Sequence, residues 1–132
     1  VESSFTDARD IYVIDCRAAY GDAAPEKLAR SFVYDREGKR FSVTDEVRFG
    51  RPASFSVPLV TYGKLEKTAD PDVFTLVRDK RSLTVRVKAD APWECSEETI
   101  ENPGRPSVKR YAFTFAGAVE KGSLTLVYEE VK

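Results

Sequence analysis

Histidine is absent from this 132-residue chain, and its absence removes several kinds of active site at once. A Ser-His-Asp or Cys-His nucleophile, a His general base and a His-ligated metal all require an imidazole. Methionine is absent too, which leads us to expect a processed product or an excised piece of a longer protein. The two cysteines, Cys16 and Cys95, form no CxxC motif. We expect them to be small buried hydrophobic residues, although a disulfide stays open because sequence alone does not pair them.

A charge excess of one sign and a long apolar run are also lacking. The 21 Lys and Arg residues are balanced by 22 Asp and Glu residues, whereas a general nucleic-acid-binding protein is strongly basic. No apolar run approaches the roughly 20 residues that span a bilayer. We therefore expect neither nucleic acid nor a membrane as a partner. The length predicts a single domain over residues 1–132, able to bury roughly two-thirds of its unfolded surface.

The sequence does contain a succession of short strand patterns separated by turn residues. In Arg40–Phe49, for example, apolar and polar residues alternate as in a half-buried strand. No segment has a sustained helical period, and residues 24–30 could form one helical turn at most. The pattern predicts an all-β fold, an antiparallel β-sandwich of about nine to ten short strands, with a barrel as the alternative. The segments with strand character are Ile11–Arg17, Leu28–Tyr34, Arg40–Phe49, Phe55–Val60, Tyr62–Lys67, Val73–Arg78, Ser82–Ala89, Val108–Phe115 and Leu124–Glu129.

Glycine and proline make this pattern more specific at several points. Gly38 follows a strand in the segment DREGK, where a hairpin turn favours a residue with positive φ. Gly50, Arg51 and Pro52 are expected to end the following strand. Pro58 cannot donate to a β-ladder, so we expect an edge strand or a bulge there. Residues 90–106 read as a strand-poor stretch with room for one short strand.

Asp45 is the unexpected residue of these strands, because it falls in the apolar row between Val43 and Val47. It could be a catalytic acid, a metal ligand, half of an ion pair, or the sign of a bulge at Asp45-Glu46. A lone buried carboxylate costs several kcal/mol unless it is paired. Arg30 projects from the preceding strand on the same side, so we favour a structural ion pair between Asp45 and Arg30. The strand supplies no partner base for catalysis.

A basic hairpin follows in the segment RDKRSLTVRVK. Its cations are Arg78, Lys80, Arg81, Arg86 and Lys88, and they are our candidate residues for binding an acidic polysaccharide. The alternative is a solvated strand face with charges that protect an edge.

Two further features have a functional and a structural interpretation. Trp93 could be a platform on which a sugar stacks, but we favour an anchor that holds a long loop on the core. The acids of Asp70-Pro71-Asp72 could bind calcium, but a turn explains them better. We expect neither a metal nor a cofactor.

Short patterns over nearly the whole chain resemble a known family. The segment IYVIDCRAAYGDAAPEKLARSFVYDREGKRFSVTDEVRF is similar to the C-terminal β-sandwich region of heparinase II/III-like proteins, and VFTLVRDKRSLTVRVKADAPWE resembles a later hairpin of the same family. This chain and the family share a strand ending in Asp followed by AAY, a D-R-x-G turn and a V-x-D strand. The residues that carry the resemblance are Asp15, Ala19, Tyr20, Arg30, Asp35, Arg36, Gly38, Val43, Asp45 and Val47.

The resemblance implies a polysaccharide lyase that cleaves uronic-acid glycans, such as glycosaminoglycans, by β-elimination. In that family the catalytic Tyr and His residues belong chiefly to a helical toroid domain, which this chain does not contain. We therefore expect a non-catalytic C-terminal β-domain whose partners are the preceding domains of the parent chain and an acidic polysaccharide. The alternatives are a free-standing carbohydrate-binding module and an adhesion-type structural β-sandwich.

Overall fold

The computed structural model describes residues 2–23 and 25–131, and within them it contains eleven β-strands and one short 3-10 helix. No helix in these ranges has the length and apolar character needed to cross a membrane. In chain order the elements are β1 (Glu2–Phe5), β2 (Arg9–Asp15), η1 (Arg17–Ala23), β3 (Lys27–Asp35), β4 (Arg40–Ala53), β5 (Ser56–Thr61), β6 (Lys64–Lys67), β7 (Val73–Arg78), β8 (Arg81–Ala89), β9 (Trp93–Ile100), β10 (Val108–Phe115) and β11 (Val119–Glu130).

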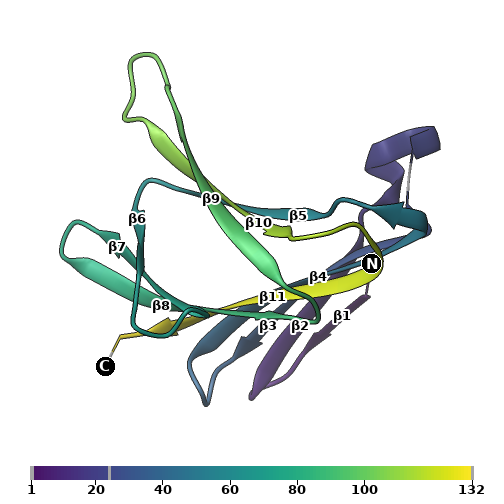
Figure 1. Ribbon diagram of the computed structural model, residues 1–132. Helices are drawn as coiled ribbons and strands as arrows, with labels where there is room; N and C mark the ends of the chain where they lie inside the picture. Colours follow the sequence, from purple (N-terminus) through teal and green to yellow (C-terminus); the bar gives the residue numbers. More distant parts are fainter. Residues whose placement is uncertain (1, 24, 132) are drawn as a thin grey trace.

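The strands form two antiparallel sheets that face each other (Figure 1). The larger sheet has eight strands in the order β1-β2-β3-β4-β11-β8-β7-β6, and the smaller has three in the order β5-β10-β9. The predicted all-β antiparallel sandwich is therefore confirmed, with eleven strands in the described ranges instead of nine or ten. The last strand of the chain, β11, lies in the middle of the larger sheet, between β4 and β8.

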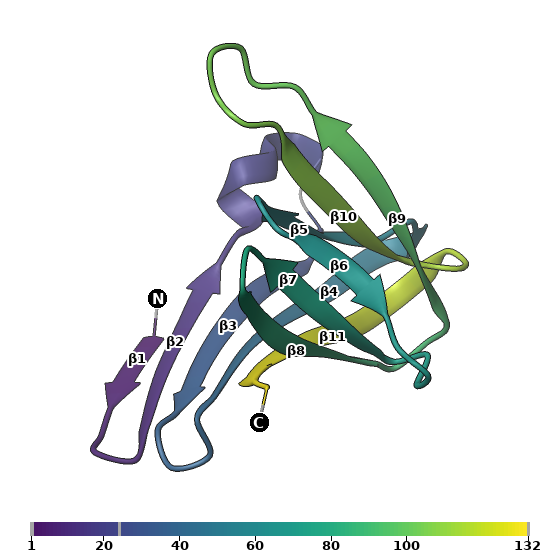
Figure 2. The ribbon, with the colours of Figure 1, turned by 90° about the vertical axis from the view of Figure 1, so that its left-hand side faces the viewer.

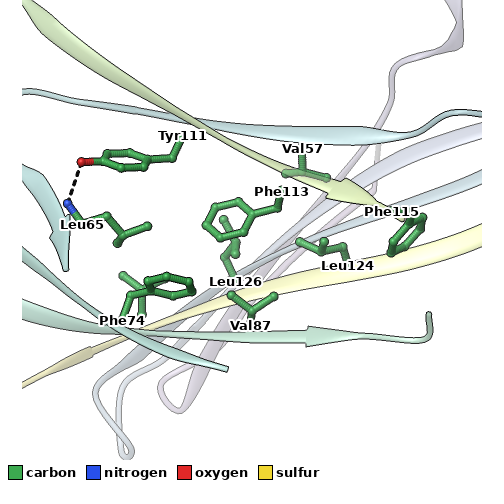
Figure 3. Packing of buried hydrophobic residues seen from close by; sticks show 10 residues of the cluster. Val57, Leu65, Phe74, Val87, Tyr111, Phe113, Phe115, Leu124 and Leu126 are labelled. Atoms are coloured by element: carbon green, nitrogen blue, oxygen red, sulfur yellow. Dashed lines mark hydrogen bonds between the residues drawn. The ribbon is translucent and has the colours of Figure 1, made fainter. Parts of the chain in front are cut away.

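The core lies where the smaller sheet covers one half of the larger one. Tyr111, Phe113 and Phe115 of β10 point towards residues of the larger sheet that include Leu65, Leu124 and Leu126 (Figure 3), because alternate residues of each strand point inward. Burying side chains of this size stabilises the fold by about 1.5–3 kcal/mol each. Within the described chain, the buried cluster takes its residues from β5–β8, β10 and β11 and none from β1–β4.

Tyr111 also links the two sheets by hydrogen bonds. Its hydroxyl accepts the backbone N–H of Leu65 in β6 at 2.9 Å, and it donates to Glu97 Oε1 in β9 at 2.8 Å. The phenol is thus buried with both hydrogen-bonding functions satisfied, and burial raises its pKa. This side chain therefore holds the smaller sheet in position relative to β6.

The other half of the larger sheet, β1–β4, contributes none of its described residues to the buried cluster, and we call it the wing; on its inner face Asp45 and Val47 of β4 are still buried, next to β11. Figure 2 shows β1 and β2 extending away from the three-stranded sheet, with the N-terminus beside β1. The register places Tyr12, Phe32, Tyr34 and Phe41 on the face that carries the core residues on β11. The aromatic rings of the wing continue outward to Phe5, which is 68% exposed. These five side chains form what we call the aromatic surface.

Three local predictions were wrong or incomplete. The stretch of residues 90–106, read as strand-poor, contains the eight-residue strand β9. The strand β4 does not end at Gly50 but runs through Pro52 to Ala53, because a register shift against β11 between Val119 and Lys121 absorbs the extra residues. The helical turn lies at Arg17–Ala23; Ala24 is outside the described residues, and Lys27–Asp35 is strand.

Gly38 shows a different reason for its glycine from the predicted one. The residue with positive φ in this turn is Lys39, at 50°, and not Gly38. A Cβ atom on Gly38 would lie 2.6 Å from Asp35 Oδ2 and 2.9 Å from Arg40 Nε. A side chain at position 38 would therefore displace the ends of these two flexible side chains from the turn. Pro58, by contrast, lies on the edge strand β5, as predicted.

Candidate functional site

Asp45, in the middle of β4, is the one buried charged residue among those the structure describes. It is 5% exposed and lies directly opposite Arg30 of β3. Arg30 Nε donates to Asp45 Oδ1 at 2.7 Å, and Arg30 Nη2 donates to Asp45 Oδ2 at 3.1 Å. The favoured ion pair is thus present in bidentate form, the stronger geometry for a guanidinium and a carboxylate. The bulge at Asp45-Glu46 is wrong, because the β3–β4 register runs without a shift.

The surroundings of this pair define its chemistry. The hydrogen bond from Arg30 to Asp45 raises the pKa of the guanidinium, and partial burial opposes that effect. Both carboxylate oxygens of Asp45 are occupied, and almost none of the residue meets solvent. Within residues 2–23 and 25–131, no group of three Cys, Asp or Glu side chains is placed to hold a metal ion. The arrangement ties β3 to β4 and does not present an acid to a substrate.

The D-R-x-G turn that follows β3 is held by its own aspartate. Asp35 Oδ1 accepts the backbone N–H of Gly38 at 3.1 Å, and Arg40 Nη2 lies 3.5 Å from Asp35 Oδ2. The N–H of Gly38 is the main cause that lowers the pKa of Asp35, and the charge of Arg40 adds to it. Arg36 reaches across to the β1–β2 turn, where it donates to the carbonyl of Thr6 at 2.7 Å and pairs with Asp10. The motif residues here fix turns.

Asp15 and Tyr20, near η1, also carry the resemblance. Arg17 donates its backbone N–H and its guanidinium to Asp15, at 3.0 and 3.2 Å to Oδ1, and lowers the pKa of that carboxyl. Tyr20 is exposed on η1. Asp15 therefore orders the start of η1. For Tyr20, no side-chain hydrogen bond within the described residues explains its presence in the motif.

The five cations of the predicted basic hairpin do not share one surface. The register pairs Arg78 with Arg81 on the inner face of the larger sheet, in step with Val85 and Val87. Arg86 and Lys88 lie on the outer face, next to Val127 and Thr125 of β11. Arg81 and Arg86 are five residues apart on β8, about 17 Å at 3.3 Å per residue. The inner group, with Lys80 at the tip, and the outer group cannot act as one site.

A groove at the end of the sandwich gathers the cation Arg78 with residues that the sequence did not connect to it. The groove has a volume of about 620 Å³ and lies between the β5–β6 turn, the end of β7 and the loop before β10. Arg78 lies over the ring of Tyr62, with 5.3 Å between its guanidinium carbon and the ring centre. Two more cations line it, Lys64 of β6 and Lys109 of β10. We call it the Tyr62 groove.

Sequence reasoning missed Lys64, Lys109 and Tyr62 as parts of one site. Tyr62 and Lys64 lie in one segment and Lys109 in another, and the two meet only because the smaller sheet folds over β6 and β7. The sequence did indicate the direction of Arg78. Arg81 alternates in step with Leu83 and Val85 and so points inward, and its paired neighbour Arg78 points the same way. No periodicity in the sequence could have placed Lys109 beside them.

Trp93 and the acids of the segment 70–72 have structural roles. Trp93 opens the strand β9 and packs on the rings of Phe74 and Phe113, with ring centres 6.1 and 5.8 Å away. It therefore anchors on the core, as we favoured, although from a strand and not from a long loop. Asp70 Oδ1 accepts the N–H of Asp72 at 2.9 Å, which makes this segment a turn.

The two cysteines are separate free thiols. Cys16 follows β2 in the wing, whereas Cys95 lies in β9 of the smaller sheet, and both are half-buried. Burial raises the pKa of the Cys95 thiol, which makes its reactive thiolate form scarcer at neutral pH. The disulfide alternative is therefore wrong for this structure.

The comparisons with known proteins add nothing to this geometry. No protein-family model matches the chain, and no curated protein matches it in sequence. The candidate sites are accordingly two: the aromatic surface of the wing and the Tyr62 groove.

Proposed function

We propose that this chain is a non-catalytic β-domain of a heparinase II/III-like polysaccharide lyase, which supports the parent protein and contacts its acidic glycan. The observation that carries the proposal is the aromatic surface. Tyr34 is 42% exposed and Phe5 68%, and neighbouring rings of the row Tyr12, Phe32, Phe41 lie with centres 6.5 and 6.2 Å apart. A continuous exposed apolar patch on a folded domain marks an interaction surface.

The occupant that fits this surface is the preceding part of the same parent chain. Strand β1 is the outermost strand of the wing, so a segment that precedes Glu2 would arrive near Tyr12, which pairs with Ser3. A preceding domain needs no long linker to lie on the rings. The inner face of the wing is continuous with the core-facing side of β11, so a domain packed there would extend the layer that the smaller sheet begins.

The non-catalytic part of the proposal rests on the absence of histidine and on the state of Asp45. The chain has no imidazole to act as a base, and the carboxylate in its core is paired with Arg30. A second candidate function, a free-standing carbohydrate-binding module, is favoured by one observation, the Tyr62 groove with its three cations.

The test compares this chain alone with a longer chain that includes the sequence encoded before it. Hydroxyl-radical footprinting read by mass spectrometry measures how far each aromatic side chain meets solvent. We expect the labelling of Tyr12, Tyr34 and Phe41 to fall several-fold in the longer chain, with Tyr62 as the control that keeps its labelling. Equal labelling of the aromatic surface in both chains would contradict a preceding domain as its occupant.

The enzymatic part has a separate assay. The isolated chain should release no unsaturated uronate, followed by its ultraviolet absorbance, from heparin, heparan sulfate or alginate. Turnover abolished by substitution of a residue of this chain would show that it is an enzyme and would overturn the proposal.

A further inference from the structure

The Tyr62 groove lies where the open end of the sandwich brings its two sheets together. Tyr62 and Lys64 belong to the crossing from the smaller sheet to the larger one, Arg78 ends β7, and Lys109 begins β10. Lys109 alternates in step with the buried Tyr111, so it points to the side of β10 that faces the larger sheet. The groove is therefore built from both sheets.

The charge of this groove is positive. Three cations line it against the single carboxylate of Asp79. Lys80 and Arg81 adjoin it at the tip of the β7–β8 hairpin. Lys109 is partly neutralised, because its Nζ lies 3.7 Å from Glu97 Oε1 and donates to Thr99 Oγ1 at 2.9 Å. Arg78 makes no ion pair with any residue in the described ranges, so its charge is available to an anion, whereas Lys64 pairs with Val77 and therefore lies on the opposite face of the sheet from Arg78.

Tyr62 adds a flat apolar surface beside these charges. Its side chain is among the exposed large hydrophobics, at 50%, and Arg78 lies over its ring. A sugar ring packs its C–H groups on an aromatic face of this kind, while a bare phosphate or sulfate gains nothing from it. Asp79 and Ser107, which also line the groove, can accept hydrogen bonds from hydroxyl groups. The carboxylate of Asp79 would only repel a ligand that is purely anionic.

The groove is held in shape by contacts beneath it. A Cβ atom on Gly63 would lie 2.6 Å from the carbonyl oxygen of Val77, so the backbone of the β5–β6 turn sits directly on the end of β7. Next along the chain, the N–H of Leu65 is bound by the Tyr111 hydroxyl. Tyr62 therefore projects from a rigid turn, which lowers the conformational entropy that is lost when a ligand binds it.

We propose that the Tyr62 groove binds one acidic pyranose unit of a glycan, packed against Tyr62 with its carboxylate or sulfate at Arg78. The inference rests on the glycan-contact part of the proposed function and gives that contact a place. It also divides the predicted basic hairpin, because Arg78 belongs to the site and the outward pair Arg86 and Lys88 does not.

The test is a calorimetric titration of the full chain at low and at physiological salt. Alginate oligomers carry carboxylates only, and heparin oligomers carry sulfates as well, so the two ligands distinguish the anion that the groove takes. We expect saturable binding of at least one of them, with an affinity that falls as salt rises. Tyr62→Ala and Arg78→Gln should each weaken binding by about tenfold, the loss of one stacking or charge-assisted contact.

The matched controls are Arg86→Gln and Lys88→Gln, which remove the same charge from the outer face. They should change the affinity by less than about twofold, since a distant exposed charge is screened. Circular dichroism of every variant checks that it is folded.

Three outcomes would overturn the inference. Binding lost in the controls but kept in the groove variants would move the site to the outer face. Equal binding of poly-glutamate would replace a sugar site by general attraction of polyanions. The absence of saturable binding of both glycans would remove the site altogether, yet it would leave the packing of the aromatic surface to be decided by its own footprinting experiment.

Discussion

We predict that removing Arg30 and removing Asp45 from their buried ion pair destabilise the protein to different extents. Asp45 is 5% exposed, whereas the side chain of Arg30 is 36% exposed, so water reaches the guanidinium and not the carboxylate. Arg30→Met leaves a charge in the core without a partner. Asp45→Leu leaves an arginine that can turn towards solvent. The first substitution should therefore destabilise the protein more than the second.

The magnitudes follow from the same geometry. Removing one partner of a buried pair costs about 3–5 kcal/mol, and because Arg30 lies at the edge of water we expect about 3 kcal/mol for Arg30→Met. Asp45→Leu loses two hydrogen bonds but strands no buried charge, so about 1–2 kcal/mol is expected. The double variant replaces the pair by two apolar side chains next to Leu124, and it should recover most of the loss.

Urea unfolding gives the measurement, with Trp93 as its probe. This single tryptophan packs on Phe74 and Phe113, so its fluorescence reports the opening of the core. With a slope of about 1–3 kcal/mol per M, the midpoint for Arg30→Met should fall by about 1–3 M. A loss under about 0.5 kcal/mol, or a larger loss in Asp45→Leu than in Arg30→Met, would refute the idea that Asp45 is a buried carboxylate that needs Arg30.

Two other substitutions test the packing and the turn. Gly122→Ala should cost about 2–3 kcal/mol by urea unfolding, because its Cβ would lie 2.2 Å from Phe115 Cε2, and Phe115→Leu should reduce that penalty in the double variant; equal penalties in both backgrounds would contradict the clash. The lowered pKa of Asp35 means that its charge stabilises the fold above the ordinary value of 3.8 and that this stability is lost as the pH falls through the lower folded pKa. The difference in free energy of unfolding between the wild type and Asp35→Asn should thus be present at pH 7 and shrink below about pH 4, and a difference independent of pH would rule out a role for the charge.

The sequence predicted well the strands that have one wet and one dry face. Arg40–Phe49 and Val108–Phe115 alternate because one side of each is buried, and the Arg30–Asp45 pair followed from the register of two neighbouring strands. Strands β1 and β9 were not identified from the sequence, because most of their residues are exposed and polar and show no sustained alternation of period two. Their pairing comes from the neighbouring strand and not from their own composition.

The candidate sites were predictable only in part, and for a topological reason. The outward direction of Arg86 and Lys88 follows from the alternation of β8, and the structure agrees with it. The Tyr62 groove depends on which edge of the smaller sheet lies over β6, which no local pattern encodes. The sequence did not predict the aromatic surface either, because the alternation of Tyr12, Phe32 and Phe41 is that of ordinary core residues. Their exposure follows from the smaller sheet having three strands against eight in the larger one.

The central position of β11 has a consequence for how the protein folds as it is synthesised. The strands β4 and β8 both pair with β11 and not with each other, so no strand pairing joins the two halves of the larger sheet until Val119–Glu130 has been synthesised. Until then, each half exposes a strand edge and an apolar face, the features that make a growing chain prone to aggregate. The larger sheet cannot close before β11 is available, and a chain that stops before Val119 would lose the strand that joins the two halves of this sheet.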